Sequence, residues 1–170
     1  MPVDLSLDAV VRLIAAANAA RGHHDLASAP PPPDVADAEA ELEARFRVSR
    51  ALAVYGTLAP GRSNHHVVAP LGGTWTPGTV EGDLSPEGWG ATLGYPALRP
   101  RAGGPAVAVQ VLTSDGLPAA WARLDDFEGA GYRRILVPVF AADGSDASDA
   151  RRLRTVANLY AAADGGSPTR

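Results

Sequence analysis

The chain of 170 residues contains neither cysteine nor lysine, and each absence excludes a class of chemistry. Without cysteine there is no thiol nucleophile, no disulfide and no zinc site built from thiolates. Without lysine there is no Schiff-base lysine and no phosphate-binding lysine of a P-loop. All 15 basic residues are therefore arginines. We attribute the missing lysines to genome composition rather than to function.

The chain also lacks a strong charge of either sign and any long hydrophobic run. Its formal net charge is −4, which gives no electrostatic footprint for nucleic acid. The apolar runs are too short to span a bilayer. Asp4 and Asp8 make the N-terminus acidic, unlike the basic start of a signal peptide. We expect a soluble cytoplasmic protein with no nucleic-acid partner and no membrane partner.

What the chain does have is enough apolar sequence, 46%, for one well-packed domain with an appendage. Residues 1–22 show the helical spacing of apolar side chains, with Ser6 as a candidate N-cap and Gly22 as a candidate stop. Four consecutive prolines at 30–33 cannot continue a helix. A second helix is predicted over 34–47, capped by Asp34.

We therefore divide the chain into an N-terminal helical extension with a Pro-rich linker, 1–48, and a main domain, 49–165. Two roles for the extension stay open. Its helices pack on the main domain, which is the usual role of short amphipathic helices, or they mediate binding to a partner or self-association.

The main domain alternates short strand patterns with few helices. The predicted strands cover 51–55, 74–84, 91–98, 105–113, 132–140 and 155–162, and the predicted helices cover 63–68, capped by Ser63, and 117–127. A polar, acidic loop is expected at 141–150. Many strands with few helices indicate an α+β fold built around a curled sheet or barrel.

The first candidate site element is the loop Tyr55-Gly56-Thr57-Leu58, which follows the first strand of the main domain. We expect Gly56 to turn the backbone through conformations that are closed to other residues. Successive N–H groups then point into one concavity, where they bind a carboxylate or a developing oxyanion. An ordinary exit from a strand into a turn is the alternative interpretation.

The second candidate is Glu128, at the predicted end of the 117–127 helix and directly before Gly129. Three effects are expected to raise its pKa: the negative end of the helix dipole, the like charges of Asp125 and Asp126, and partial burial against Phe127. A raised pKa suits a general base that later returns its proton as an acid. A solvated acidic turn is the alternative.

The other motifs in the sequence give little support for a metal site, a serine hydrolase or a dinucleotide site. His65 and His66 are adjacent, so they project about 100° apart on a helix and cannot easily hold one ion together. His23 and His24 have the same arrangement. No G-x-S-x-G serine elbow is present, and Gly72-Gly73 lacks the glycine spacing of a dinucleotide site. We predict no metal and no cofactor.

Taken together, four ordered segments resemble the gamma-glutamylcyclotransferase-like proteins of the AIG2-like group. The segments are Val54–Leu58 followed by Pro60-Gly61 and Asn64-His65, then Val80–Leu84, Gly94–Leu98, and Leu124–Gly129 with Tyr132 and Arg133. The resemblance covers roughly residues 50–163. It implies a small mixed β-barrel with flanking helices.

The resemblance also implies roles for individual residues. Glu128 matches the family's acid/base, and Tyr55, Gly56, Thr57 and Leu58 match the residues that line the substrate pocket, with Tyr132 as a further candidate beside Glu128. Related members cleave gamma-glutamyl amides by intramolecular aminolysis and release 5-oxoproline and a free amine. The alternatives are a non-catalytic small-molecule binding module of the same fold, and another amide- or ester-forming chemistry in the same pocket.

Overall fold

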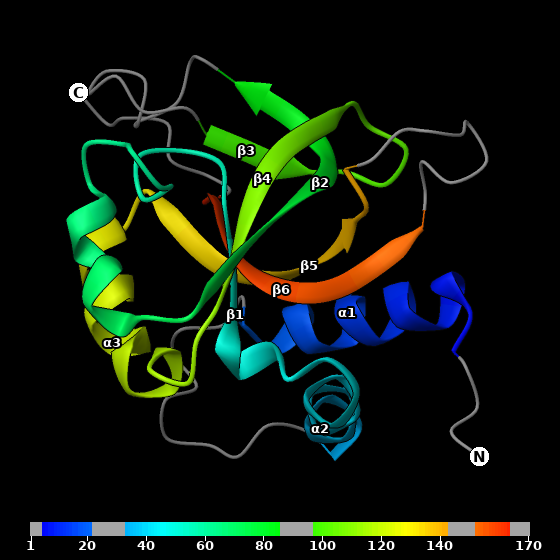
Figure 1. Cartoon of the computed structure of the whole chain (residues 1–170). Coiled ribbons are helices and arrows are strands. Elements are labelled where there is room, and N and C mark those ends of the chain that lie inside the picture. Colours follow the sequence, from blue (N-terminus) through cyan, green and yellow to red (C-terminus); the bar gives the residue numbers. More distant parts are fainter. Residues whose placement is uncertain (1–4, 22–32, 86–96, 143–151, 164–170) are drawn as a thin grey trace, which may run out of the picture.

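The described residues of the computed structural model, 5–21, 33–85, 97–142 and 152–163, form a six-stranded sheet that closes on itself (Figure 1). The strand order is β3-β2-β4-β1-β6-β5, and a further pairing of Thr79 with Phe140 joins β2 to β5. Five strands therefore make a closed barrel, and β3 extends β2 outside the ring. The bounds are β1 Ala51–Val54, β2 Thr74–Ser85, β3 Ala97–Pro100, β4 Ala106–Thr113, β5 Tyr132–Phe140 and β6 Leu153–Ala162.

Successive side chains along each strand point alternately into the barrel and out of it, so every second residue fills the interior. On β5, Ile135, Val137 and Val139 point inward and join a buried cluster that receives side chains from all six strands. β1 and β6 contribute mainly alanines to this cluster, such as Ala53 and Ala157. These two strands run parallel to each other, whereas every other pairing in the sheet is antiparallel. Small residues on the parallel pair leave room for the branched side chains opposite.

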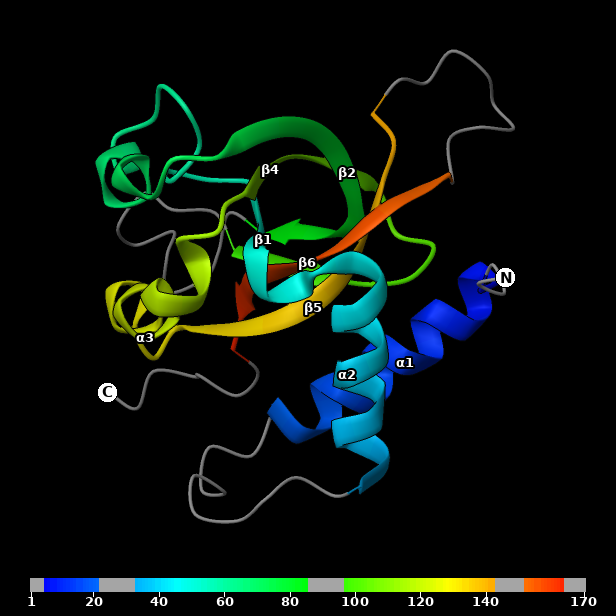
Figure 2. The ribbon, with the colours of Figure 1, turned by 60° about the horizontal axis from the view of Figure 1, so that its bottom comes forward.

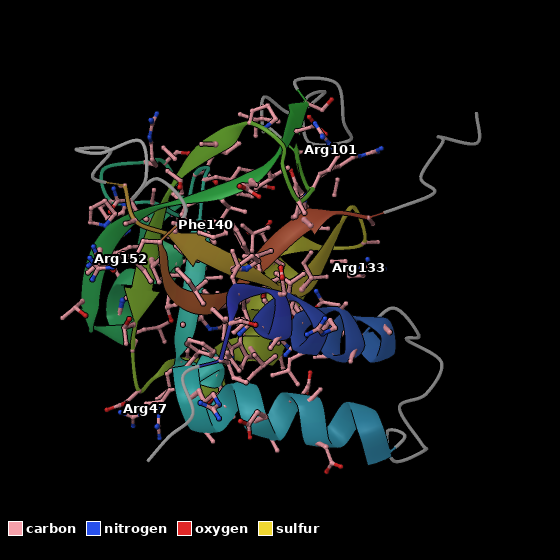
Figure 3. The ribbon with its side chains drawn as sticks, turned by 90° about the vertical axis from the view of Figure 1, so that its right-hand side faces the viewer. Arg47, Arg101, Arg133, Phe140 and Arg152 are labelled. Atoms are coloured by element: carbon pink, nitrogen blue, oxygen red, sulfur yellow. The ribbon has the colours of Figure 1, made fainter. Side chains whose placement is uncertain are left out.

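Closure of the barrel depends on a glycine. A Cβ atom on Gly78 would lie 2.6 Å from Cγ1 of Val139 and 3.2 Å from the carbonyl oxygen of Phe140. Any side chain at this position would push β2 away from β5 where the two strands meet. Figure 3 shows Phe140 at this end of the barrel and Arg133 at the opposite end, where β5 begins.

Helix α3, Leu117–Glu128, covers one outer face of the barrel, at the left of Figure 1. Two short 3₁₀ turns, η3 His65–Val67 and η4 Ala69–Leu71, extend this cover. Leu117, Ala120 and Leu124 of α3 are buried against outward-facing residues of β1, β4 and β6. Their i, i+3, i+7 spacing places all three on one face of the helix.

Helices α1, Leu7–Arg21, and α2, Pro33–Phe46, cross each other beneath a different outer face, as Figures 1 and 2 show. With η2, Val48–Arg50, they enclose a third cluster that includes Val10, Leu42 and, from the barrel, Leu136. The extension thus packs on the main domain. The boundary drawn at residue 48 stays a prediction, as does self-association.

A side chain of α1 completes the edge of β5. The amide nitrogen of Asn18 donates to the carbonyl oxygen of Leu136, and the N–H of Leu136 donates to Oδ1 of Asn18, both at 2.8 Å. The two bonds reproduce the pairing that a neighbouring strand would provide. They satisfy backbone groups that would be costly to bury without partners.

Most predicted elements are confirmed within a few residues, and Ser6 caps α1 through a 3.3 Å bond to the N–H of Ala9. Ser63 was wrong as a cap, because η3 begins after Asn64. α2 begins at Pro33, so Asp34 lies inside its first turn and not at the cap. Residues 91–96 and 143–150 of the predicted strand and loop lie outside the described residues. Within the described ranges, no helix has the length and apolar character needed to cross a bilayer.

Gly78→Ala should destabilise the protein, because the new methyl group overlaps Val139 at the closure of the barrel. We expect a loss of about 1–3 kcal/mol in the free energy of unfolding, measured by urea denaturation. Gly56→Ala is the matched control, because a Cβ there meets nothing within 4 Å. Equal stability of the two variants would contradict this account of closure.

Candidate active site at the end of β1 and α3

The loop after β1 directs its carbonyl groups toward the protein and leaves its N–H groups available. The carbonyl oxygens of Gly56, Thr57 and Leu58 accept from the N–H of Ala59, the N–H of Asn64 and the His65 ring. The Asn64 amide also donates to Oγ1 of Thr57 at 2.9 Å. Among the described residues, the N–H groups at positions 56–58 have no acceptor. Consecutive unpaired donors of this kind suit an anion or an oxyanion.

The expected reason for Gly56 was wrong. Its φ angle is not positive, so the backbone at this position does not need glycine. The left-handed glycine of the loop is Gly61, with φ 78°. What Gly56 supplies is space, since a Cβ would find no atom within 4 Å. The open volume lies beside the available N–H groups.

Tyr55 is fixed by two hydrogen bonds through its hydroxyl group. The hydroxyl donates to the carbonyl oxygen of Tyr160 at 2.8 Å and accepts from the N–H of Leu98 at 3.2 Å. It thereby links β1 to β6 and β3 at one end of the barrel. The single hydroxyl proton is committed to Tyr160, so Tyr55 offers a ligand its ring rather than a proton.

Glu128 is the last residue of α3 and is partly buried. Burial raises the pKa of its carboxyl group from the ordinary 4.5 to about 7. Within the described residues no hydrogen bond reaches this carboxylate, so nothing offsets its loss of water. At neutral pH a carboxyl group with this pKa both accepts and donates a proton readily.

The expected effect of burial on the pKa of Glu128 is confirmed, whereas the charges of Asp125 and Asp126 are not among the causes of the shift. The charge of Asp125 is compensated, because Arg134 Nε and Nη2 donate to its two oxygens at 2.8 and 3.2 Å and the hydroxyl of Tyr160 donates at 2.7 Å. Loss of solvent alone accounts for the raised pKa of Glu128.

Electrostatics show which predicted residues share the site. Burial raises the pKa of the Tyr55 hydroxyl, the hydrogen bond from Leu98 opposes the rise, and the charges of Tyr132 and Glu128 add to it. Burial and the hydrogen bond to Asp125 raise the pKa of Tyr160, and the charge of Glu128 adds to this rise. Tyr55 is therefore close enough to both Tyr132 and Glu128, which come from two other segments, to interact electrostatically with each. Tyr132 also packs at the edge of the outer cluster under α3.

His65 and His66 each contact a nearby carbonyl group and do not converge on a common point. Nδ1 of His65 lies 3.0 Å from the carbonyl oxygen of Leu58, and its ring lies 5.6 Å from that of Trp75. Nδ1 of His66 bonds the carbonyl oxygen of Ser63 at 3.2 Å. In the part of the chain that the structure describes, no three His, Asp or Glu side chains come together in a way that would hold an ion.

Three residues near Asp125 of α3 were not predicted as part of the site: Arg134 and Tyr160, which bond its carboxylate, and Asn158, which bonds Arg134. One signal was present in the sequence. Asn158 interrupts an otherwise apolar strand, Val-Ala-Asn-Leu-Tyr, and a polar residue in such a run needs buried partners. Nothing local, however, identifies those partners, which lie more than 20 residues away in the chain.

Comparison with known proteins agrees with this architecture. The model of the gamma-glutamyl cyclotransferase, AIG2-like family matches residues 52–167. An AIG2-like protein from mouse (Mus musculus), GGACT, is similar in structure, with 22% identity, a TM-score of 0.50, and coverage of 69% of this chain and 80% of that one. The predicted family and the predicted α+β barrel are thus confirmed.

Two further solved structures show weaker likeness. A protein specific to uropathogenic E. coli has 23% identity, coverage of 65% and 78%, and a TM-score of 0.46. An uncharacterized protein from Pyrococcus horikoshii has 25% identity, coverage of 66% and 76%, and a TM-score of 0.44. No curated protein matches the chain in sequence.

The burial of Glu128 predicts a specific pH dependence of stability. Its pKa is about 7 in the folded protein and near 4.5 when solvated. The folded state therefore binds more protons between these values, and the free energy of unfolding falls as pH rises through this window. We expect Glu128→Gln to match the wild type near pH 4 and to exceed it near pH 8, by at most about 3 kcal/mol. Urea denaturation at both pH values measures this difference, and an equal difference at both would contradict the assigned pKa.

Proposed function

Because the chain belongs to the gamma-glutamyl cyclotransferase, AIG2-like family, we propose that it is a cyclotransferase acting on a gamma-glutamyl amide. The products are 5-oxoproline and a free amine. The observation that carries this proposal is the partly buried carboxyl group of Glu128, with a pKa of about 7, within electrostatic reach of Tyr55 at the end of β1.

The reaction is an intramolecular aminolysis. Ionised Glu128 takes a proton from the substrate's alpha-ammonium group, and the freed amine attacks the gamma-carbonyl carbon. A five-membered ring forms and the carbonyl oxygen becomes an oxyanion. The intermediate then collapses as Glu128 gives its proton to the leaving amine and the bond to that amine breaks. The ring nitrogen loses its extra proton to the Glu128 carboxylate, which passes it to the departing amine. The carboxylate is thus regenerated at the end of each turnover.

A pKa near 7 suits both halves of this cycle. A carboxyl group with a pKa of 4.5 would be a weak base toward an ammonium group. At neutral pH only a small fraction of it would be protonated and able to act as an acid. Matching the pKa to the working pH makes one residue effective in both directions, and such a group typically contributes about 10²–10⁴-fold. The chemistry uses no protein nucleophile, which is compatible with a chain without cysteine or lysine.

The N–H groups of positions 56–58 supply the second requirement, which is to hold negative charge on the substrate. They are suited to the glutamyl carboxylate or to the oxyanion that forms during attack. Holding the flexible glutamyl group in a folded shape also removes much of the entropic barrier, because well-oriented intramolecular reactions reach effective molarities of about 10⁵–10⁸ M. The loop and Glu128 thus have separate tasks.

Glu128→Gln should abolish turnover while the fold is retained. Glutamine fills the same volume but cannot accept the proton, so kcat should fall by about 10²–10⁴-fold. The measurement is release of 5-oxoproline from a panel of gamma-glutamyl amines and dipeptides. The panel also identifies the leaving group.

Asp126→Asn is the matched control for this experiment. Asp126 is exposed on the same turn of α3, and its removal should leave the rate unchanged. A Glu128→Gln variant as fast as the wild type would end the assignment of Glu128. A folded wild type that binds a gamma-glutamyl compound and releases no 5-oxoproline from the panel would favour the binding-module alternative.

Gly56→Ala should weaken catalysis and leave stability unchanged. The new methyl group enters the open space beside the N–H groups, where the substrate's charged group would lie. Loss of one hydrogen bond to a charged group costs about 1.5–3 kcal/mol, or about 10- to 100-fold in kcat/KM. Steady-state kinetics with the best substrate of the panel test this, and an unchanged kcat/KM would exclude the loop as the anion site.

A further inference from the structure

We propose that Arg21, in the N-terminal helix α1, is a positioning residue for Glu128. This inference rests on the proposed function in treating Glu128 as the acid/base. A chain of contacts runs from α1, through the buried Asn158 of β6, to the last turn of α3. The extension would then be part of the catalytic apparatus.

The first link joins α1 to the barrel. Nη1 of Arg21 donates to Oδ1 of Asn158 at 2.7 Å, while its Nε donates to Oε1 of Glu39 on α2 at 2.8 Å. Asn158 is 1% exposed and is one of two buried polar residues in the described ranges. Its amide nitrogen donates to the carbonyl oxygen of Val48 at 2.7 Å. Both ends of the Asn158 side chain are therefore committed, which fixes the position of Oδ1.

The second link is that the same oxygen accepts from a second arginine. Nη1 of Arg134 lies 3.4 Å from Oδ1 of Asn158, a weaker bond than that of Arg21. Arg134 is on β5, and its guanidinium group lies 4.4 Å from the ring centroid of Trp121 on α3. Asn158 thus orients one arginine from the extension and one from the barrel toward the same point.

The third link connects Arg134 to the catalytic helix. Arg134 forms a two-pronged ion pair with Asp125 of α3, and the hydroxyl of Tyr160 donates to the same carboxylate. Burial alone would raise the pKa of Asp125. The hydrogen bonds from Arg134 and Tyr160 and the charges of Arg134 and Arg21 outweigh burial and hold it below its usual value. The charge of Arg21 therefore reaches the Asp125 carboxylate.

The last link is along the helix itself. Asp125 and Glu128 are three residues apart and lie on the same turn. The carbonyl oxygen of Asp125 also accepts from the N–H of Gly129 at 3.0 Å, which closes that turn directly after Glu128. The bonds from Arg134 and Tyr160 to Asp125 therefore also fix the backbone segment that carries Glu128. Within the described residues no hydrogen bond holds the Glu128 carboxylate, so its position depends on its backbone.

The position of α1 is itself well determined. Asn18, one turn before Arg21, pairs with both backbone groups of Leu136 on β5. Val10, Ile14 and Ala17 are buried in the cluster beneath the barrel. Arg21 is therefore presented from a helix that is anchored independently of the network, as a positioning role requires.

The test exploits the burial of Glu128. If the last turn of α3 loosens, Glu128 gains water and its pKa falls from about 7 toward 4.5. The titratable groups that interact with it are Tyr55 and Tyr160, with Asp125 on its own helix and Tyr132 beside Tyr55. In Arg21→Met we expect the pKa of Glu128, followed by ¹³C NMR of its side-chain carboxyl, to fall by at least about half a unit. We expect kcat for 5-oxoproline release to fall by about tenfold, with a smaller change in KM.

Three further variants separate positioning from simple loss of stability. Arg12→Met removes an exposed arginine from the same helix and should change neither readout. Leu42→Ala destabilises the packing of the extension without touching the network, and should lower stability yet keep the pKa of Glu128. Arg21→Lys keeps the charge and one donor, and should recover most of the loss. If Arg21→Met does not fold, Arg21→Gln, which retains an amide donor, replaces it in both measurements.

The outcomes are distinct. A lower pKa of Glu128 in the Arg21 variant supports the inference, and this titration needs no turnover. If the pKa falls but the wild type releases no 5-oxoproline, the proposed function is overturned and the positioning role of Arg21 stands. An unchanged pKa in a folded Arg21 variant overturns the inference, whether or not its rate is altered. An equal fall of the pKa in Leu42→Ala also overturns it, because any loosening of the extension would then have the same effect.

Discussion

The site depends on one asymmetry between two carboxylates on the same turn of α3. Asp125 is held by two nitrogens of Arg134 and by the hydroxyl of Tyr160, so it remains ionised and fixed. Glu128 has lost water without gaining a hydrogen-bond partner among the described residues, so its pKa lies near 7. In the proposed reaction, Glu128 exchanges its proton because it is not ion-paired, and Asp125, which is ion-paired, holds the turn in place.

The barrel makes this arrangement possible because it brings three separate segments to one end. Tyr55 follows β1, Tyr132 begins β5, and Glu128 ends a helix packed on the outer face. The hydroxyl of Tyr55 bonds both the carbonyl oxygen of Tyr160 and the N–H of Leu98, which ties β1 to its neighbours at this end. At the opposite end, Gly78 permits the contact between β2 and β5 that closes the ring.

The extension illustrates how an appendage can become integral to a domain. Its apolar stripe covers a face of the barrel, as amphipathic helices commonly do. Two polar residues of α1, Asn18 and Arg21, bond to groups of the barrel. Asn18 completes an open strand edge, and Arg21 reaches the buried amide of Asn158. These directional bonds satisfy polar groups of the barrel that apolar side chains could not satisfy.

Most helices and strands of this protein, their order, and the candidate residues Tyr55–Leu58 and Glu128 could be predicted from the sequence. Strand alternation, helical spacing and the Ser6 cap are local signals, and four ordered segments carried the family resemblance. The physical properties of these site residues, such as the space around Gly56 and the pKa of Glu128, depend on the tertiary structure. Gly56 was expected to relieve backbone strain but instead leaves open space. Burial was expected to raise the pKa of Glu128 together with the charge of its neighbours, but burial is the cause that the structure supports, since partners from β5 and β6 compensate the charge of Asp125. Solvation and ion pairing are set by residues distant in the chain, so no local pattern specifies them.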